Sequence, residues 1–303
     1  MITLPPYLSP GDTIAITCPA GYMPLEKATA CIETLQQWGY EVLVGKTLGG
    51  SSENYFSAPD DNRCDELQAM LDDKSVKAIL FGRGGYGMGR IIDKLNFKKF
   101  KKHPKWVIGF SDITVMHCHL FTNYNIASLH APMAAAFNDG EDNSFYIQTL
   151  RKAIAGEKQS YQCLTHSFNK KGKATGKLIG GNLALLAHVI GTASDFDTKD
   201  CILFLEDIGE YSYNIDRMLY QLKRSDKMKK LAGIIIGGFT DMKDTERPFG
   251  KTVDEIIHEI LKDVDVPVCF NFPVSHGKEN VSLKIGADYI LNVGKERSTL
   301  KEI

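Results

Sequence analysis

The stretch KWVIGFSDITVMHCHLF, residues 105–121, joins a short apolar run to a segment of helical composition. Its first part, WVIGF at 106–110, has the length and the Val and Ile content of a buried strand. Serine and aspartate follow at once, and a helix is predicted from about Asp112. The stretch therefore predicts a strand–turn–helix unit with Ser111 in its turn.

Similar units occupy the rest of the first half of the chain. Apolar, β-branched runs alternate there with segments of helical composition. Strands that alternate with helices argue for a parallel sheet covered on both faces. The predicted strands are 13–20, 40–45, 76–85 and 106–110, and the third of them runs into a glycine-rich loop. The predicted helices are 27–38, 63–73 and a short one at 89–95.

The composition of the sequence changes at 157–177, where EKQSYQCLTHSFNKKGKATGK is polar and rich in lysine. We place a domain boundary here, which divides the chain into residues 1–160 and 161–303. The second part alternates again, so a second α/β domain is expected, and it ends in a hairpin-like tail, IGADYILNVG. Its predicted strands are 201–207, 232–239 and 266–273, and its predicted helices are 215–224, 252–263 and, after a short loop, the helix of 180–191.

The composition is that of a globular protein with enough apolar material for two cores. Of the 303 residues, 43% are hydrophobic and 24% are charged, and the net charge of −1 provides no basic field for nucleic acid. No apolar stretch approaches membrane-spanning length. The N-terminus lacks the features of a signal peptide, and the seven cysteines form no CxxC pair. These features predict a reduced, cytoplasmic protein that binds neither nucleic acid nor a membrane.

Ser111 has two interpretations on its local sequence. A serine at the carboxyl end of a strand, beside the amides of a following helix, has the geometry of a nucleophile. Gly109 leaves room for such a turn, although the second glycine of the G-x-S-x-G elbow is missing. Serine is also a common N-cap, which is the simpler explanation of the residue. A nucleophilic role depends on a base and an orienting acid elsewhere in the chain.

His276 and Glu206 are the candidates for that base and that acid. His276 lies in NFPVSHGKEN, in a loop after a predicted strand, where α/β proteins place their ligands. Glu206 follows the apolar residues of CILFLED, and a partly buried carboxylate there suits the stabilisation of an imidazolium. A surface-loop histidine and an ion-pairing or helix-capping acid remain the alternatives.

The loop GRGGYG, residues 82–87, follows the predicted strand VKAILF. Adjacent glycines allow backbone amides to approach a ligand closely, as in an oxyanion hole. The loop also matches G-x-G-x-x-G, the fingerprint of dinucleotide-binding proteins. That fingerprint normally follows the first strand of its sheet, and this loop follows the third. Dinucleotide binding is therefore the less favoured of the two interpretations.

Together these motifs resemble those of the LD-carboxypeptidase family of serine peptidases, over essentially the whole chain. The family includes the muramoyltetrapeptide carboxypeptidases and the microcin C immunity peptidases. Six motifs in the family's order make the resemblance specific. They are LSPGDTIAITCPAG (8–21), GRGGYG (82–87), IGFSD (108–112), GGNL (180–183), LEDIGE followed by IDRML (205–219) and PVSHGKEN (273–280).

The resemblance implies a catalytic triad of Ser111, Glu206 and His276. It also implies oxyanion amides from Asp112 and from Gly85, the latter assigned only to within one glycine. The implied fold is an N-terminal flavodoxin-like (amidotransferase-like) parallel-sheet domain plus a smaller C-terminal α/β domain, with the triad assembled across their interface. Neither a metal nor an organic cofactor is required, and a homodimer is expected.

The implied reaction is hydrolysis of the amide bond to a C-terminal D-amino acid. In the murein case, D-Ala is released from a tetrapeptide in the cytosol during cell-wall recycling. An immunity-type peptidase that cleaves aminoacyl-sulfamoyl adenylates is the rival within the family. Segment 239–252 is short and lacks the tryptophan of a base-stacking insertion, which favours the murein enzyme. Arg83 and Asn182 are candidates for binding the terminal carboxylate, and the third substrate residue, lysine or diaminopimelate, stays open.

Overall fold

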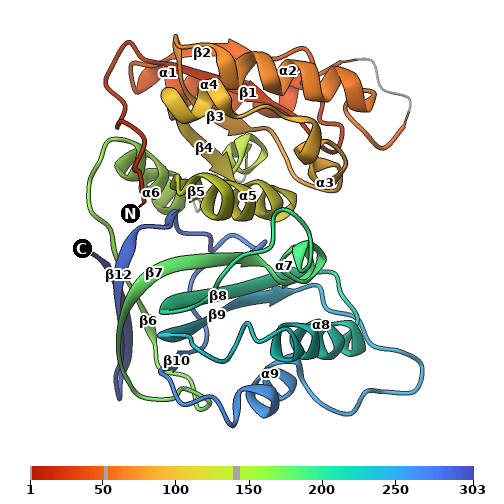
Figure 1. Cartoon of the computed structure of the whole chain (residues 1–303), viewed down its shortest axis with the longest axis vertical. Helices are drawn as coiled ribbons and strands as arrows, with labels where there is room; N and C mark the ends of the chain where they lie inside the picture. The colour runs from red at the N-terminus through yellow and green to blue at the C-terminus, as the bar shows by residue number, and fades with distance from the viewer. Residues whose placement is uncertain (1, 51–53, 139–143) are drawn as a thin grey trace.

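The computed structural model describes residues 2–50, 54–138 and 144–303. Figure 1 shows two α/β parts stacked along the long axis of the molecule, the first in red to yellow-green and the second in green to blue. Each part is built mainly around its own sheet. Within these described ranges, no helix is both long enough and apolar enough to cross a membrane.

The first sheet has the strand order of a flavodoxin-like domain. Its parallel strands are β1 (Thr13–Thr17), β2 (Glu41–Val44), β3 (Val76–Phe81), β4 (Trp106–Gly109) and β5 (Ser128–His130). They pair in the order β2-β1-β3-β4-β5, which confirms the expected parallel sheet. The α-helices of this part are α1 (Thr29–Gln37), α2 (Asp60–Asp72), α3 (Met88–Ile91), α4 (Lys98–Lys102), α5 (Thr114–Tyr124) and α6 (Ser144–Ile154).

The second sheet is mixed, and helices pack on it, as expected for a second α/β unit. Its strands are β6 (Ser160–Leu164), β7 (Gly172–Asn182), β8 (Cys201–Ile208), β9 (Gly233–Thr240), β10 (Val268–Cys269), β12 (Asp288–Val293) and β13 (Arg297–Glu302). They pair in the order β10-β9-β8-β7-β12-β13-β6. The β10-β9-β8-β7 pairings are parallel and the others antiparallel. The helices are α7 (Leu183–Val189), α8 (Ser212–Arg224) and α9 (Val253–Leu261).

Three strands differ from the sequence-based expectation. The polar segment 157–177 contains β6 and the start of β7, and β7 continues through the Gly180–Gly181 pair that was expected to form a loop. Polar residues form these strands because one face of an antiparallel sheet can face water. Both glycines are required by close contacts, since a Cβ on Gly180 would lie 2.0 Å from the carbonyl oxygen of Phe204 in β8 and one on Gly181 would lie 2.5 Å from Oγ1 of Thr114 in α5. The expected strand 266–273 is reduced to the two residues of β10.

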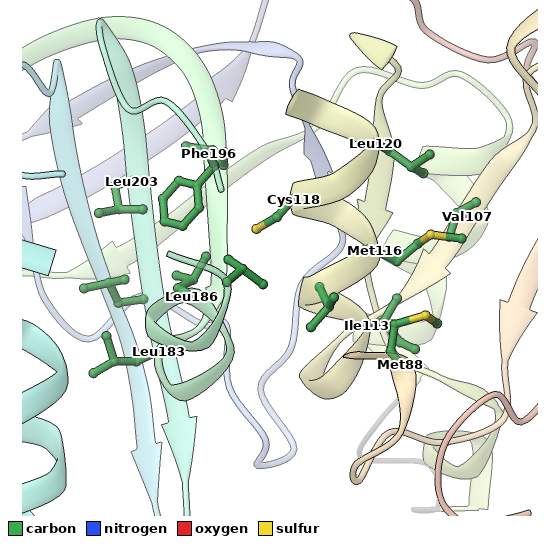
Figure 2. Close-up of a cluster of buried hydrophobic side chains, with 14 of the residues drawn as sticks. Met88, Val107, Ile113, Met116, Cys118, Leu120, Leu183, Leu186, Phe196 and Leu203 are labelled. Carbon is green, nitrogen blue, oxygen red and sulfur yellow. The ribbon is translucent and has the colours of Figure 1, made fainter. Parts of the chain in front are cut away.

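One hydrophobic cluster continues from the first sheet to the second. Figure 2 shows α5 between the two parts, with Met116 on the side of β4 and Cys118 on the side of α7. Met116 lies near Val107, and Cys118 lies toward Leu186. All four side chains are buried. Because close-packed interiors resist displacement, groups that face the junction from opposite sides are held at fixed positions.

Strand β11 (Leu283–Ile285) joins the two parts a second time. It belongs to the C-terminal half of the chain, yet it pairs antiparallel with β5 at the edge of the first sheet. Its residue Lys284 is fully buried, and its Nζ lies 2.9 Å from Oε1 of Glu302 in β13. The division of the chain at 160–161 stays a prediction. Strand β11 follows that division in the chain but pairs with the sheet that precedes it.

Candidate active site

Ser111 occupies a strained turn at the carboxyl end of β4. Its φ is 64°, in the left-handed region that non-glycine residues rarely adopt. A short 3-10 helix, Ser111–Ile113, then leads into α5. Ser111 is not the N-cap of either helix, because Phe110 and Ile113 hold those positions and neither helix has a side-chain cap. The helix-capping interpretation of Ser111 is therefore wrong.

The glycine-rich loop packs directly on Ser111. A Cβ added to Gly84 would lie 2.8 Å from Cβ of Ser111 and 2.9 Å from its Oγ. A Cβ on Gly109 would lie 3.0 Å from side-chain atoms of Ile113 and Phe81. Both glycines are therefore required by close approach rather than by an unusual φ, since neither is among the glycines with positive φ.

Three backbone amides beside Ser111 point to an anion site. In the described part of the chain, the N–H groups of Gly84, Gly85 and Asp112 donate to no protein acceptor. The carbonyl of Gly84 is engaged, since it accepts from the N–H of Gly21 at 3.2 Å. Unpaired amides next to a nucleophile are the groups that stabilise an oxyanion. Either glycine, with Asp112, suits that role.

His276 and Glu206 form a close pair. Nδ1 of His276 lies 2.5 Å from Oε2 of Glu206, and the Glu206 side chain is 0% exposed. Nε2 of His276 has no hydrogen-bond partner among the described residues. The ring packs edge-on against Phe110 at a centroid distance of 4.8 Å. The carboxylate thus orients the imidazole and leaves Nε2 available as a base.

Ser111 and His276 line the same cavity, which has a volume of about 390 Å³. Gly84, Gly85 and Arg83 also line it. A neighbouring cavity of about 510 Å³ shares His276 and Arg83. The two cavities therefore form one cleft, large enough for a short peptide, with a serine, an imidazole and free amides along it.

Two adjacent glycines in β9 make room for the His276 loop. A Cβ on Gly237 would lie 2.2 Å from the carbonyl oxygen of Val274, and one on Gly238 would lie 2.6 Å from Cβ of Ser275. Any side chain at either position would displace the backbone that carries His276. Sequence analysis missed this role, although a glycine pair inside the apolar run AGIIIGGF was a usable signal.

Asp207, which follows Glu206 in β8, forms a buried hydrogen bond with Asn182. Asn182 caps α7, since its Oδ1 accepts from the N–H of Leu185 at 3.1 Å, and its Nδ2 donates to Oδ1 of Asp207 at 2.7 Å. Burial raises the pKa of Asp207 to about 7. Asn182 is 3% exposed and does not line the cleft, so we do not propose it as a substrate contact.

Arg83, by contrast, is exposed and lies at the cleft. Its Nη1 donates to the carbonyl oxygen of Tyr22 at 3.0 Å, which fixes the guanidinium beside the glycine loop. Lys27 and Lys278 also line the cleft, as does Glu26. Among the described charged residues of the lining, cations therefore outnumber acids, as suits a site for a free carboxylate.

Two buried histidines lie near the site. Nε2 of His117 lies 2.8 Å from the carbonyl oxygen of Gly109, and its Nδ1 lies 2.8 Å from Oγ of Ser128. Burial lowers the pKa of His117 to about 4 and that of His130 well below its ordinary value. Both are therefore neutral, structural side chains at physiological pH.

The dinucleotide interpretation of the glycine loop has little support in this geometry. The loop leads into α3, which has four residues, too few for the helix dipole that holds a pyrophosphate. Gly84 is also packed against Ser111. In the part of the chain that the structure describes, no group of His, Cys, Asp or Glu side chains is arranged to hold a metal ion.

Gly84→Ala is expected to lower kcat/KM by about 100-fold or more without unfolding the protein, because the added methyl displaces Ser111 or its amides. Steady-state hydrolysis and thermal melting measure the two effects. Gly89→Ala is the matched control, since the nearest atom to its added Cβ is the Nε2 of His188, at 3.2 Å. Activity of Gly84→Ala within about threefold of wild type contradicts this packing argument.

Two models of one family match the chain. The LD-carboxypeptidase N-terminal domain matches residues 14–131, and the LD-carboxypeptidase C-terminal domain matches residues 175–291. The first match includes Ser111 and the glycine loop, and the second includes Glu206 and His276. The two matches therefore contribute different parts of the cleft.

Individual relatives agree with these matches. The chain is 32% identical to the probable murein peptide carboxypeptidase of Bacillus subtilis (strain 168), over 98% of the chain and 94% of the relative. The muramoyltetrapeptide carboxypeptidase from Oxalobacter formigenes has a TM-score of 0.85 at 29% identity, over 96% of this chain and 98% of the other. The microcin C7 self-immunity protein MccF, in complex with aspartyl sulfamoyl adenosine, has a TM-score of 0.87 at 20% identity over 99% of each chain, which shows a shared fold. The chain belongs to the LD-carboxypeptidase family of hydrolases.

Proposed function

We propose that this chain is a serine carboxypeptidase that removes the C-terminal D-amino acid, D-Ala, from murein tetrapeptides. Its catalytic groups are Ser111, His276 and Glu206. One observation carries the proposal: a histidine held 2.5 Å from a buried carboxylate shares a cavity with a serine in a strained turn. The murein and muramoyltetrapeptide carboxypeptidases among the relatives support the substrate class.

The proposed reaction begins with attack of the Ser111 hydroxyl on the scissile carbonyl. Nε2 of His276 takes the hydroxyl proton, and Glu206 stabilises the resulting imidazolium through Nδ1. The carbonyl oxygen becomes an oxyanion, which accepts hydrogen bonds from the amides of Asp112 and of Gly85 or Gly84.

The second half of the reaction repeats these proton transfers. His276 gives its proton to the leaving amine as the C–N bond breaks, and the D-amino acid departs. A water molecule then attacks the acyl-serine ester as His276 removes a proton from that water. Return of that proton to Ser111 releases the shortened peptide and restores the enzyme.

The proposal includes a cytoplasmic location, where recycled murein peptides are processed, and a homodimeric state. Both stay proposals. Cell fractionation tests the first, and sedimentation or light scattering of the purified protein tests the second.

A panel of peptides tests the function. Murein tetrapeptides ending in D-Ala, with lysine or diaminopimelate at the third position, are incubated with the enzyme beside LL- and DD-terminated analogues and an aminoacyl-sulfamoyl adenylate. Mass spectrometry of the products is expected to show loss of D-Ala from the LD-linked tetrapeptides. Cleavage of the adenylate but of no peptide rejects the murein assignment in favour of the immunity-type reaction, and cleavage of neither rejects both.

Arg83→Ala is expected to raise KM for the tetrapeptide by about 10- to 100-fold and to change kcat little, because a hydrogen bond to a charged group contributes about 1.5–3 kcal/mol. The guanidinium lines the cleft, where it can hold the substrate carboxylate before and during reaction. Arg83→Lys, which keeps the charge, should recover part of the loss. An unchanged KM in Arg83→Ala assigns carboxylate binding elsewhere, with Lys27 as the next candidate.

A further inference from the structure

Asp112 presents two groups to the site, a backbone amide and a carboxylate. The amide lies beside Ser111 and has no protein acceptor among the described residues. The carboxylate is buried, with the residue 1% exposed, and its Oδ2 accepts from the N–H of Met88 at 2.7 Å. Met88 directly follows the glycine loop 82–87. One residue of the nucleophile turn therefore holds the far end of the loop that carries Gly84 and Gly85.

Arg63 holds the same end of the loop through the neighbouring residue, Gly87. It lies in α2, is 0% exposed, and its Nη1 donates to the carbonyl oxygen of Gly87 at 3.3 Å and to that of Pro19. Its Nε donates to the carbonyl oxygen of Ala58 at 3.0 Å, and its guanidinium lies 4.8 Å from the ring centre of Phe56. A buried cation with these partners has little freedom to move.

Gly87, at the end of the loop, packs closely against Arg63 of α2. A Cβ on Gly87 would lie 2.7 Å from Nη1 of Arg63 and 2.7 Å from Cα of Ala20. Its φ of 157° is also one that a side chain rarely accepts. Asp60 adds a further tie, because its carboxylate pairs with Arg63 and with Arg90 of α3, the latter at 2.8 Å. The loop end is thus fixed between α2 and the turn at Ser111.

Gly84 and Gly85 have no side chains with which to fix their own amides. An oxyanion hole works only if its donors are already in place when charge develops, and a displacement of about 1 Å lowers the rate by about 100-fold. We propose that the Asp112 carboxylate and the Arg63 guanidinium are positioning residues that hold the glycine-loop amides at a fixed distance from Ser111. This inference rests on the function proposed above.

The experiment compares Asp112→Ala, Asp112→Asn and Arg63→Lys with the wild-type enzyme. It measures kcat and KM for a D-Ala-terminated murein tetrapeptide, and the rate at which a fluorophosphonate labels Ser111. The phosphonyl group mimics the tetrahedral intermediate and needs no peptide recognition, so the labelling rate reports the serine, its base and the oxyanion amides without a contribution from peptide binding. Asp61→Ala is the control, because Asp61 lies in α2 with Arg63 but forms only an exposed pair with Lys94.

Asp112→Ala is expected to lower kcat and the labelling rate by about 10- to 100-fold in parallel, with KM within about threefold of wild type. In Asp112→Asn the amide oxygen still accepts from Met88, so most of the loss should be recovered. Arg63→Lys keeps the charge, but one ammonium cannot replace the bonds that Nε, Nη1 and Nη2 make together, so this variant should resemble Asp112→Ala. Asp61→Ala should match wild type in every measurement.

The outcomes separate this inference from the proposed function. If wild-type Ser111 is not labelled and no peptide is cleaved, the proposed function fails. If the wild type is labelled and Asp112→Ala reacts as fast, the positioning role is rejected. A kcat loss that Asp112→Asn does not recover, or that is accompanied by an equal rise in KM, also rejects it. If Asp112→Ala does not fold, Arg63→Lys and Asp112→Asn decide by the same criteria.

Discussion

Ser111→Ala is expected to lower tetrapeptide turnover by about four orders of magnitude or more, because removing a triad nucleophile leaves only binding and oxyanion stabilisation. The substitution removes one hydroxyl that caps neither helix, so the melting temperature should stay near that of the wild type. Steady-state hydrolysis with product detection measures the rate. His276→Ala should cause a similar loss, and the double variant should be scarcely worse than either single variant.

Ser111→Gly provides the matched control for folding. The left-handed φ of 64° is unfavourable for serine but costs glycine nothing, so this variant should be inactive yet more stable, by about 1 kcal/mol in the free energy of unfolding. Strain that persists at a nucleophile indicates selection for its position rather than for stability. Turnover of Ser111→Ala within about tenfold of wild type contradicts the nucleophile assignment.

The strand–turn–helix at 105–121 could be predicted because its apolar run and its helix occupy adjacent stretches of sequence. The same local logic located β1, β2 and β3. It failed for β6 and β7, whose polar residues face water on one side, and for the glycines of β7, which are required by contacts with other segments rather than by a turn. Contacts between distant segments decided those strands, and no local pattern records such contacts.

In the candidate site, too, local sequence indicated some features, and contacts between distant segments determined others. Residue type and position at strand ends made Ser111, Glu206 and His276 candidates, and the structure places Ser111 and His276 on one cavity and Glu206 beside His276. Asn182 shows what local sequence leaves out, because its side chain caps α7 and donates to Asp207, a residue 25 positions away in the chain. The clearance provided by Gly237 and Gly238 depends on how close a separate loop comes, which only the folded chain reveals.

Glu206→Gln is expected to lower kcat by about 10³- to 10⁴-fold while leaving the fold intact. The amide matches the carboxylate in shape but carries no charge, so it cannot stabilise the imidazolium that forms as Ser111 attacks, and it can present an N–H to Nδ1. Because Oε1 of Glu206 has no partner among the described residues and the side chain is fully buried, the neutral variant should be at least as stable as the wild type.

Two further measurements make this result specific. Glu206→Asp keeps the charge but withdraws it by one methylene, and is expected to retain more activity than Glu206→Gln. Fluorophosphonate labelling of Ser111 should slow in Glu206→Gln as kcat does, because both reactions need His276 as a base. Labelling at the wild-type rate in Glu206→Gln would show that this carboxylate does not assist the imidazole, and the gain in catalysis ascribed to the 2.5 Å pair would have to come from another group.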